Sequence, residues 1–126
     1  MKKIILTENA PAPIGPYSQA VQSGPFLFCS GQIPLDPKTN EVLKGPAGEQ
    51  AAKVMENISA LLKAAGYGFE NILKTTIYLT DMNDFAAVNE VYGKYFPNNP
   101  PARSTVAVAG LPKGVNVEIE VTAFKS

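Results

Sequence analysis

The most regular hydrophobic pattern in this chain is helical and lies in residues 49–65. Apolar residues there recur at spacings of three and four, which places them in one stripe along a helix. The members of this stripe are Ala51, Val54, Met55, Ile58, Leu61, Leu62 and Ala65. Gly66 follows directly, at a position typical of a helix end. A second helix is predicted over residues 84–95, and its apolar side comprises Phe85, Val88, Tyr92 and Tyr95.

The last predicted strand, residues 115–124, has the clearest alternation along the chain. Its odd-numbered apolar residues face one way, and Asn116, Glu118, Glu120 and Thr122 face the other. Further strands are predicted at residues 3–6, 20–22, 26–30, 72–80 and 104–109. Turn residues at 23–25 and 110–114 predict two hairpins. The second hairpin would place Glu118 on a strand next to the one that carries Arg103.

This order of elements predicts an α+β fold with a single mixed β-sheet and two helices packed on one face. The chain has 126 residues, which suits one domain spanning residues 1–126. In such a fold the second face of the sheet has no cover within one chain. Because only 17% of the residues are charged, weakly polar surface is available for subunit contacts. We therefore expect a homo-oligomer that buries the open face.

The composition disfavours several classes of function. Eleven basic and eleven acidic residues give a net charge of zero, whereas nucleic-acid binding normally needs a basic surplus or stripe. The chain has no histidine, which excludes Ser-His-Asp or Cys-His catalysis and a histidine metal site. The single cysteine, Cys29, cannot form an internal disulfide and is expected to be a buried thiol. Without a secretory signal or a membrane-spanning apolar run, we expect a cytoplasmic protein with no membrane partner.

Arg103 is the only arginine in the chain and stands at the start of a predicted strand. A guanidinium can hold a carboxylate or phosphate through two parallel hydrogen bonds, which a lysine cannot do. The alternative is an ordinary surface or ion-paired arginine. Glu118 and Glu120 lie on one strand face, about 7 Å apart. The alternative interpretation of this pair is an ordinary solvated sheet face. Local sequence also allows Tyr17 to be a packed tyrosine and Asn89 a surface amide.

Five short motifs resemble, in order and spacing, those of the RidA (YjgF) family. They are Gly15-Pro16-Tyr17-Ser18-Gln19, Ser30-Gly31-Gln32-Ile33-Pro34, Asn83-Asp84-Phe85-Ala86-Ala87-Val88-Asn89, Pro101-Ala102-Arg103-Ser104 and Val117-Glu118-Ile119-Glu120. The similarity extends from about residue 7 to residue 124. It implies a fold similar to that of chorismate mutase. It also implies a homotrimer whose sheets face inward, with a cleft at each subunit boundary.

The resemblance implies an activity as well, the hydrolysis of reactive enamines and imines without a metal or cofactor. The implied substrates are 2-iminobutanoate and 2-iminopropanoate, which become 2-oxo acids and ammonia. By position, Arg103 would clamp the substrate carboxylate, and Glu118 would activate the attacking water and carry protons to the leaving amine. By the same resemblance, the pocket would be lined by Tyr17, Ser30 and Gly31 and supported by Asn89. In a trimer these residues need not come from one subunit.

Thr105 departs from the family pattern, because many members have cysteine at this position. A thiol role is lost there while a hydroxyl remains, so we expect an effect on substrate range rather than on hydrolysis. Two other functions stay open. One is a non-catalytic ligand-binding or regulatory trimer that recognises small 2-oxo acids. The other is a nuclease or translation inhibitor, against which the neutral charge, the single arginine and the lack of histidine argue.

Overall fold

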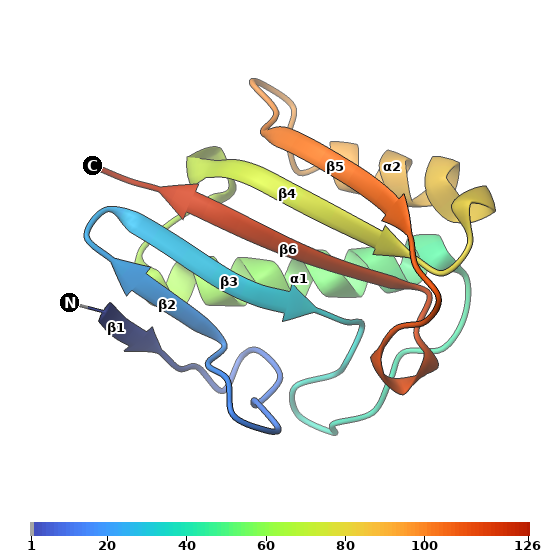
Figure 1. The fold of residues 1–126 in the computed structure, drawn as a ribbon, viewed down its shortest axis with the longest axis horizontal. Helices are drawn as coiled ribbons and strands as arrows, with labels where there is room; N and C mark the ends of the chain where they lie inside the picture. The colour runs from blue at the N-terminus through green and yellow to red at the C-terminus, as the bar shows by residue number, and fades with distance from the viewer. Residues whose placement is uncertain (1) are drawn as a thin grey trace.

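The computed structural model describes residues 2–126 and contains one six-stranded sheet with two helices on one face (Figure 1). The strands are β1 (Lys2–Ile5), β2 (Ala20–Ser23), β3 (Phe26–Gln32), β4 (Ile72–Leu79), β5 (Ala102–Ala107) and β6 (Val117–Phe124). The helices are α1 (Ala47–Ala65) and α2 (Phe85–Gly93), with short 3-10 turns η1 (Phe69–Asn71), η2 (Met82–Asp84) and η3 (Pro112–Gly114). The predicted α+β fold with a mixed sheet is confirmed.

The strand order is β1-β2-β3-β6-β4-β5, and only β4 and β5 pair in parallel. Helix α2 connects these two strands, as a parallel crossover requires. The predicted hairpin between β5 and β6 is wrong, because β6 lies between β3 and β4. Residues 108–116 form a connection long enough to pass the end of β4, where the Val108 amide donates to the Leu79 carbonyl at 2.7 Å.

Helix α1 packs against β3 and β6 and provides most of the helical side of the core. The predicted stripe is confirmed, since its residues from Ala51 to Leu62 are buried. On β6 the matching buried side chains are Val117, Ile119, Val121 and Ala123. Gly66 ends α1 with a positive φ of 81°, and its amide faces the last carbonyls of the helix. Cys29 is buried as expected, and this burial raises the pKa of its thiol to about 12.

The opposite face of the sheet is open and carries an aromatic cluster of Phe26, Phe28 and Phe124. These side chains are 40%, 49% and 36% exposed. The Phe26 ring lies 6.2 Å from that of Phe28 and 5.1 Å from that of Phe124. Exposed rings grouped on a sheet face are typical of a contact surface rather than of a solvated one. Nothing within residues 2–126 covers this face, as the fold prediction anticipated.

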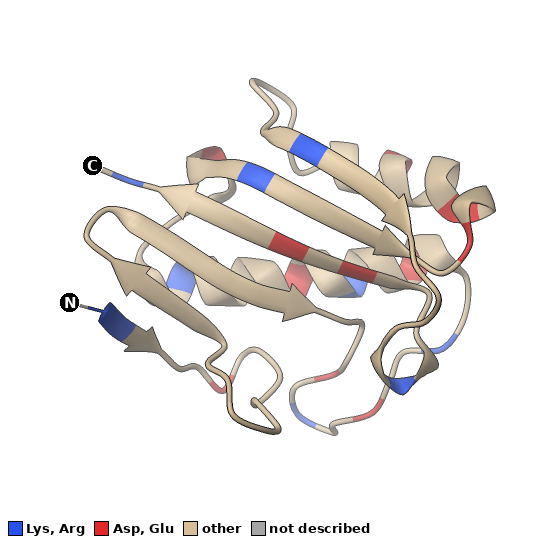
Figure 2. Cartoon of the chain, viewed as in Figure 1, with Lys and Arg blue, Asp and Glu red and all other residues tan. Residues whose placement is uncertain are grey.

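Charged residues are spread over separate elements (Figure 2). Basic residues lie on β1, α1, β4, β5 and the connection before β6, and they do not form one stripe in the described part of the chain. This distribution agrees with the neutral composition and offers no electrostatic track for a nucleic-acid backbone. Within residues 2–126, neither helix combines the length and hydrophobicity needed to cross a membrane.

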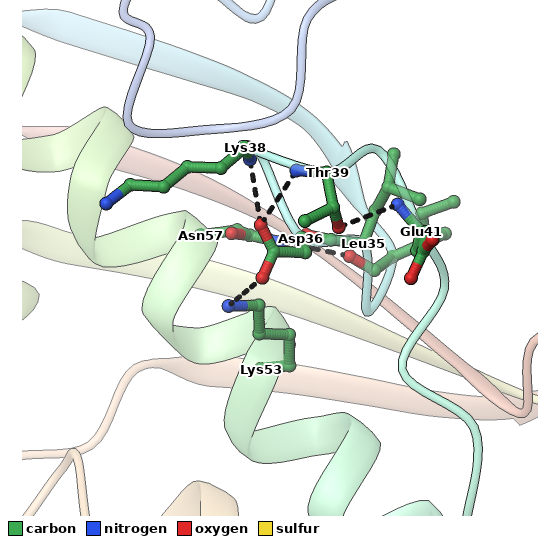
Figure 3. A network of polar contacts seen from close by, with 8 residues as sticks. Leu35, Asp36, Lys38, Thr39, Glu41, Lys53 and Asn57 are labelled. Carbon is green, nitrogen blue, oxygen red and sulfur yellow. Dashed lines mark hydrogen bonds and ion pairs between the residues drawn. The ribbon is translucent and has the colours of Figure 1, made fainter.

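Helix α1 anchors the loop that follows β3 (Figure 3). Buried Asn57 donates from Nδ2 to the carbonyls of Ile33 and Leu35, at 3.1 and 3.0 Å. In the same loop, Asp36 accepts from two backbone amides at 2.8 and 3.2 Å, which holds the pKa of its carboxyl below the usual value. Lys53 of α1 lies 3.9 Å from Asp36 and adds a weaker attraction. The loop therefore presents Ile33 and Leu35 in a defined position.

Candidate active site

A cavity of about 570 Å³ opens where the end of β3 meets the start of β6. Four of the residues singled out from the sequence line it, namely Tyr17, Ser30, Gly31 and Glu118. The remaining lining residues are Pro11, Ala12, Ile14, Gln19, Gln32, Ile33, Leu35, Pro112 and Lys113. The lining is therefore mostly apolar, with few charged groups, as is common in small-molecule sites.

Gln19 shapes one wall of this cavity by holding the proline-rich loop before β2. The side chain is buried, and its Oε1 accepts from the Thr7 amide at 2.7 Å. Its Nε2 lies 3.0, 3.1 and 2.9 Å from the carbonyls of Thr7, Ala10 and Pro11. A loop with several prolines has few internal hydrogen bonds of its own, so one buried amide satisfies its backbone groups. Tyr17 lies at the end of this loop.

Ser30, on β3, also holds the end of the proline-rich loop. Its hydroxyl donates to the Ser18 carbonyl at 2.6 Å, and its amide donates to the Gln19 carbonyl at 2.9 Å. The Tyr17 hydroxyl accepts from the Ile14 amide at 3.3 Å. Ser30 therefore fixes the loop against the sheet, while the half-exposed Tyr17 ring lines the cavity.

Glu118 lines the cavity, and its carboxylate lies next to Gly31. A Cβ atom at position 31 would overlap the carboxylate oxygen of Glu118 and come within 2.9 Å of its Cδ. The φ of Gly31 is not in the left-handed region, so what favours glycine here is the space that the Glu118 carboxylate occupies and not the backbone conformation. The missing side chain at Gly31 thus allows the carboxylate of Glu118 to face the cavity.

Two causes raise the pKa of Glu118. Burial is the larger one, and repulsion from Glu120 on the same strand face adds to it. Glu120 accepts a hydrogen bond from the Tyr78 hydroxyl, and Tyr78 stands opposite Glu118 in the β4–β6 register. That hydrogen bond is the main reason why the pKa of Tyr78 is raised. A half-buried carboxyl that binds a proton more readily than usual is suited to general acid–base work.

Replacing Glu120 with glutamine is expected to lower the pKa of Glu118. The substitution removes the neighbouring negative charge, so ionising Glu118 becomes less unfavourable, while its burial stays the same. A pH titration of the side-chain carboxyl followed by ¹³C NMR measures this shift directly. Glu41→Gln, at an exposed loop position, is the matched control. An unchanged Glu118 titration in the Glu120 variant would mean that burial alone accounts for the raised pKa.

Arg103 lies on the other side of the sheet, on edge strand β5 and next to α2. Its Nη1 donates to Asn89 Oδ1 at 2.7 Å. Its guanidinium carbon lies 5.4 Å from the Phe85 ring centroid and 5.2 Å from that of Tyr92. Tyr92 is itself fixed by a 2.8 Å hydrogen bond between its hydroxyl and that of Thr75. The guanidinium is therefore positioned by one amide and two rings, and most of its N–H groups remain available for an anion.

Thr105 stands two residues beyond Arg103 on β5. It lines an open hollow of about 440 Å³ together with Met82, Phe85 and Arg103. The Thr105 hydroxyl is buried, yet it has no hydrogen-bond partner among residues 2–126. A buried polar group without a partner is uncommon in native proteins. The described residues thus leave this hydroxyl available to a group from outside residues 2–126.

The predicted site is divided within one chain (Figure 1). Arg103 pairs with Thr75 of β4, and Glu118 pairs with Tyr78, so β4 separates the two functional residues. From strand spacing and rise, their backbones are roughly 14 Å apart. Their side chains also lie on opposite faces, since Arg103 contacts α2 and Glu118 faces the open side. The expectation that they meet on neighbouring strands of one chain is wrong.

Sequence reasoning missed three residues that build the site. The motif at residues 15–19 does not indicate that Gln19 holds a cavity wall. The turn composition of residues 110–114 does not indicate that Lys113 lines the cavity with Glu118. Gln50 of α1 accepts from the Asn116 amide at 2.9 Å and so ties the helix to the start of β6. A glutamine beside an apolar stripe carries no sequence signal for such a bond, because its partner lies far away in the chain.

Known proteins similar to this chain cover almost its whole length. The family described as Endoribonuclease L-PSP matches residues 7–125. A RutC family protein of Pyrococcus horikoshii is 58% identical over 125 residues, covering 99% of each chain. The mouse 2-iminobutanoate/2-iminopropanoate deaminase is 49% identical, covering 99% of this chain and 93% of the mouse protein.

The structure of Escherichia coli TdcF with bound serine superposes with a TM-score of 0.94 at 46% identity. The match covers 98% of this chain and 99% of TdcF. The agreement of sequence and fold over almost the whole chain confirms the family that the five motifs indicated. The chain belongs to the Endoribonuclease L-PSP family, which is the RidA family.

Proposed function

We propose that this protein is a deaminase that hydrolyses small 2-imino acids to 2-oxo acids and ammonia, and that it works as a homotrimer. The division of the site carries this proposal. One face of the sheet holds a positioned cation, Arg103, which has no carboxylate within 4.0 Å among residues 2–126. The other face holds a cavity with a proton-handling carboxylate, Glu118. In the proposed trimer, Arg103 of one subunit reaches the cavity of its neighbour and completes the site.

Three features of the chain support such an assembly. Strand β5, which bears Arg103, lies at the edge of the sheet, so another chain can approach it directly. The open face carries the exposed cluster of Phe26, Phe28 and Phe124, whose burial would stabilise a subunit contact. The buried Thr105 hydroxyl has no partner among the described residues.

Light scattering should therefore give three times the mass of one chain.

Residues of this chain can supply every group that the proposed reaction uses. Arg103 holds the substrate carboxylate, and the imine carbon is already electrophilic, so orientation contributes much of the rate. Glu118 takes a proton from water as the water oxygen attacks C2 of the protonated imine. The acid form of Glu118 then protonates the nitrogen of the adduct. The C–N bond breaks as the hydroxyl proton passes to Glu118, which then gives it to the departing ammonia. Ammonium and the 2-oxo acid leave, and the Glu118 carboxylate is restored.

Two of the relatives support this substrate class. The mouse relative is named for 2-iminobutanoate and 2-iminopropanoate, and TdcF was solved with serine. Serine and the imino acids share a carboxylate with a nitrogen on the neighbouring carbon. We extend this recognition to the present chain, with Arg103 as the carboxylate partner. An endoribonuclease activity, which the family description names, is the less favoured proposal because of the neutral charge and the dispersed basic residues.

The test is a coupled assay in which a threonine dehydratase releases 2-iminobutanoate from threonine. Adding the purified protein is expected to speed the appearance of 2-oxobutanoate and ammonia several-fold. The reason is that an imine oriented in the site reacts with water faster than a free imine does. Heat-denatured protein at the same concentration is the control. Equal rates with and without native protein would overturn the deaminase proposal. If 2-oxobutanoate still bound under those conditions, a non-catalytic binding trimer would replace it.

A further inference from the structure

Lys113 has a backbone conformation that is unusual for a residue with a side chain. It lies in turn η3 with φ 58° and ψ 19°, in the left-handed region, and Gly114 follows with a φ of 68°. Residues other than glycine seldom adopt this conformation, and such positions gather at binding and catalytic sites. The neighbouring Gly114 would tolerate a positive φ without cost, yet the chain places a lysine in that conformation as well.

Lys113 lines the same 570 Å³ cavity as Glu118 and is itself exposed. Among the described residues that line this cavity, Lys113 is the only basic one and Glu118 the only acidic one. The two charges do not neutralise each other, since the one ion pair within 4.0 Å in residues 2–126 joins Lys53 and Asp36. Lys113 therefore has no carboxylate partner among the described residues, and an anion that enters the cavity would not have to displace one.

In a single chain the cavity is also larger than a three- or four-carbon acid requires. Sites of 300–1,000 Å³ ordinarily enclose ligands of drug size. In the proposed reaction, Arg103 of the neighbouring subunit holds one carboxylate and Glu118 faces C2. The rest of the substrate then extends into the remaining cavity, past apolar walls that include Ile33 and Leu35. Lys113 is the one basic residue among the described residues that line this part of the proposed site.

We propose that Lys113 binds a second carboxylate, so that the site accepts 2-imino and 2-oxo diacids in addition to the small monoacids. This inference rests on the proposed function for the identity of the 2-imino group. The recognition itself is a charge-assisted hydrogen bond between an ammonium and a carboxylate in a partly enclosed, mostly apolar cavity. The same lysine would gain nothing from a substrate whose side chain ends in a methyl group.

Binding of two stable product analogues of equal chain length tests this. Isothermal titration calorimetry is carried out with 2-oxoglutarate and with 2-oxopentanoate, which lacks the second carboxylate. The wild type is expected to bind the diacid about tenfold more tightly than the monoacid. Lys113→Met is expected to remove this preference, and Lys113→Arg to keep most of it because the charge remains. Lys63→Met, an exposed lysine on α1 away from the cavity, is the matched control and should retain the preference.

Equal affinities of the wild type for the two acids would overturn the inference, and so would an unchanged preference in Lys113→Met. The outcome is separable from that of the deaminase assay. If imines are hydrolysed but the diacid preference is missing, the diacid proposal is wrong and the deaminase proposal is supported. If the preference depends on Lys113 but no imine is hydrolysed, the diacid site stands and the deaminase proposal is wrong.

Discussion

Replacing Glu118 with glutamine is expected to lower kcat for 2-iminobutanoate by about 10²–10⁴-fold, the usual contribution of a positioned general acid–base group. Glutamine keeps the size of the side chain and its position over Gly31, but it can neither accept the proton of the attacking water nor return it. The raised pKa of Glu118 means that the lost group was suited to both steps. Single-turnover rates with imine generated in place measure the effect on chemistry.

Glu120→Gln is the matched control for this experiment, because the residue lies on the same strand face and is held by Tyr78 rather than facing Gly31. It should reduce kcat far less than Glu118→Gln does. Its acidic limb of kcat/KM should move to lower pH, since the pKa of Glu118 falls when its negative neighbour is removed. A Glu118→Gln enzyme with near-normal kcat would remove Glu118 from the proton transfers.

Arg103→Lys is expected to lower kcat/KM by about 100-fold, although the charge is preserved. A lysine ammonium cannot form two parallel hydrogen bonds with a carboxylate, and each hydrogen bond to a charged group contributes about 1.5–3 kcal/mol. The substitution also ends the planar contact with the Phe85 and Tyr92 rings and the hydrogen bond to Asn89. Initial rates over a range of imine concentrations, with circular dichroism as a check of folding, give the comparison.

Co-expression of the two inactive variants tests the shared site. In mixed trimers, a site that takes Arg103 from a Glu118→Gln subunit and Glu118 from an Arg103→Lys subunit is intact. Random assembly of equal amounts should make about a quarter of the sites intact, because each of the two residues is native with a probability of one half. Activity should return to about that fraction of the wild type. Complete absence of recovery would contradict a site formed between subunits.

Local pattern predicted the elements well because burial of one face is a local requirement. The stripe from Ala51 to Leu62 is the buried side of α1, and the alternation of residues 115–124 describes β6 with its two polar and apolar faces. The observed boundaries of the helices differ from the predicted ones by about one or two residues. Helix α1 begins at Ala47 rather than at residue 49, and α2 ends at Gly93 rather than at residue 95.

Strand pairing could not be read in the same way, and the candidate site depended on it. The residues at 110–114 have the composition of a hairpin turn, but they belong to a longer connection that leads past β4. A central position for β6 brings its alternating apolar residues under α1 while both of its edges are paired. Such a choice depends on contacts between residues far apart in the chain, which local composition does not encode.

The sequence by itself determined the chemical inventory of this protein: one guanidinium at Arg103, paired carboxylates at Glu118 and Glu120, and no histidine. It also determined the family through five motifs and the amphipathic faces through their period. Only the tertiary structure decided that Arg103 and Glu118 face opposite sides of one sheet, with Asn89 beside the first and Gly31 beneath the second. The reason is physical, because side-chain direction follows the period of a strand, whereas the strand's neighbours follow from packing of the whole core.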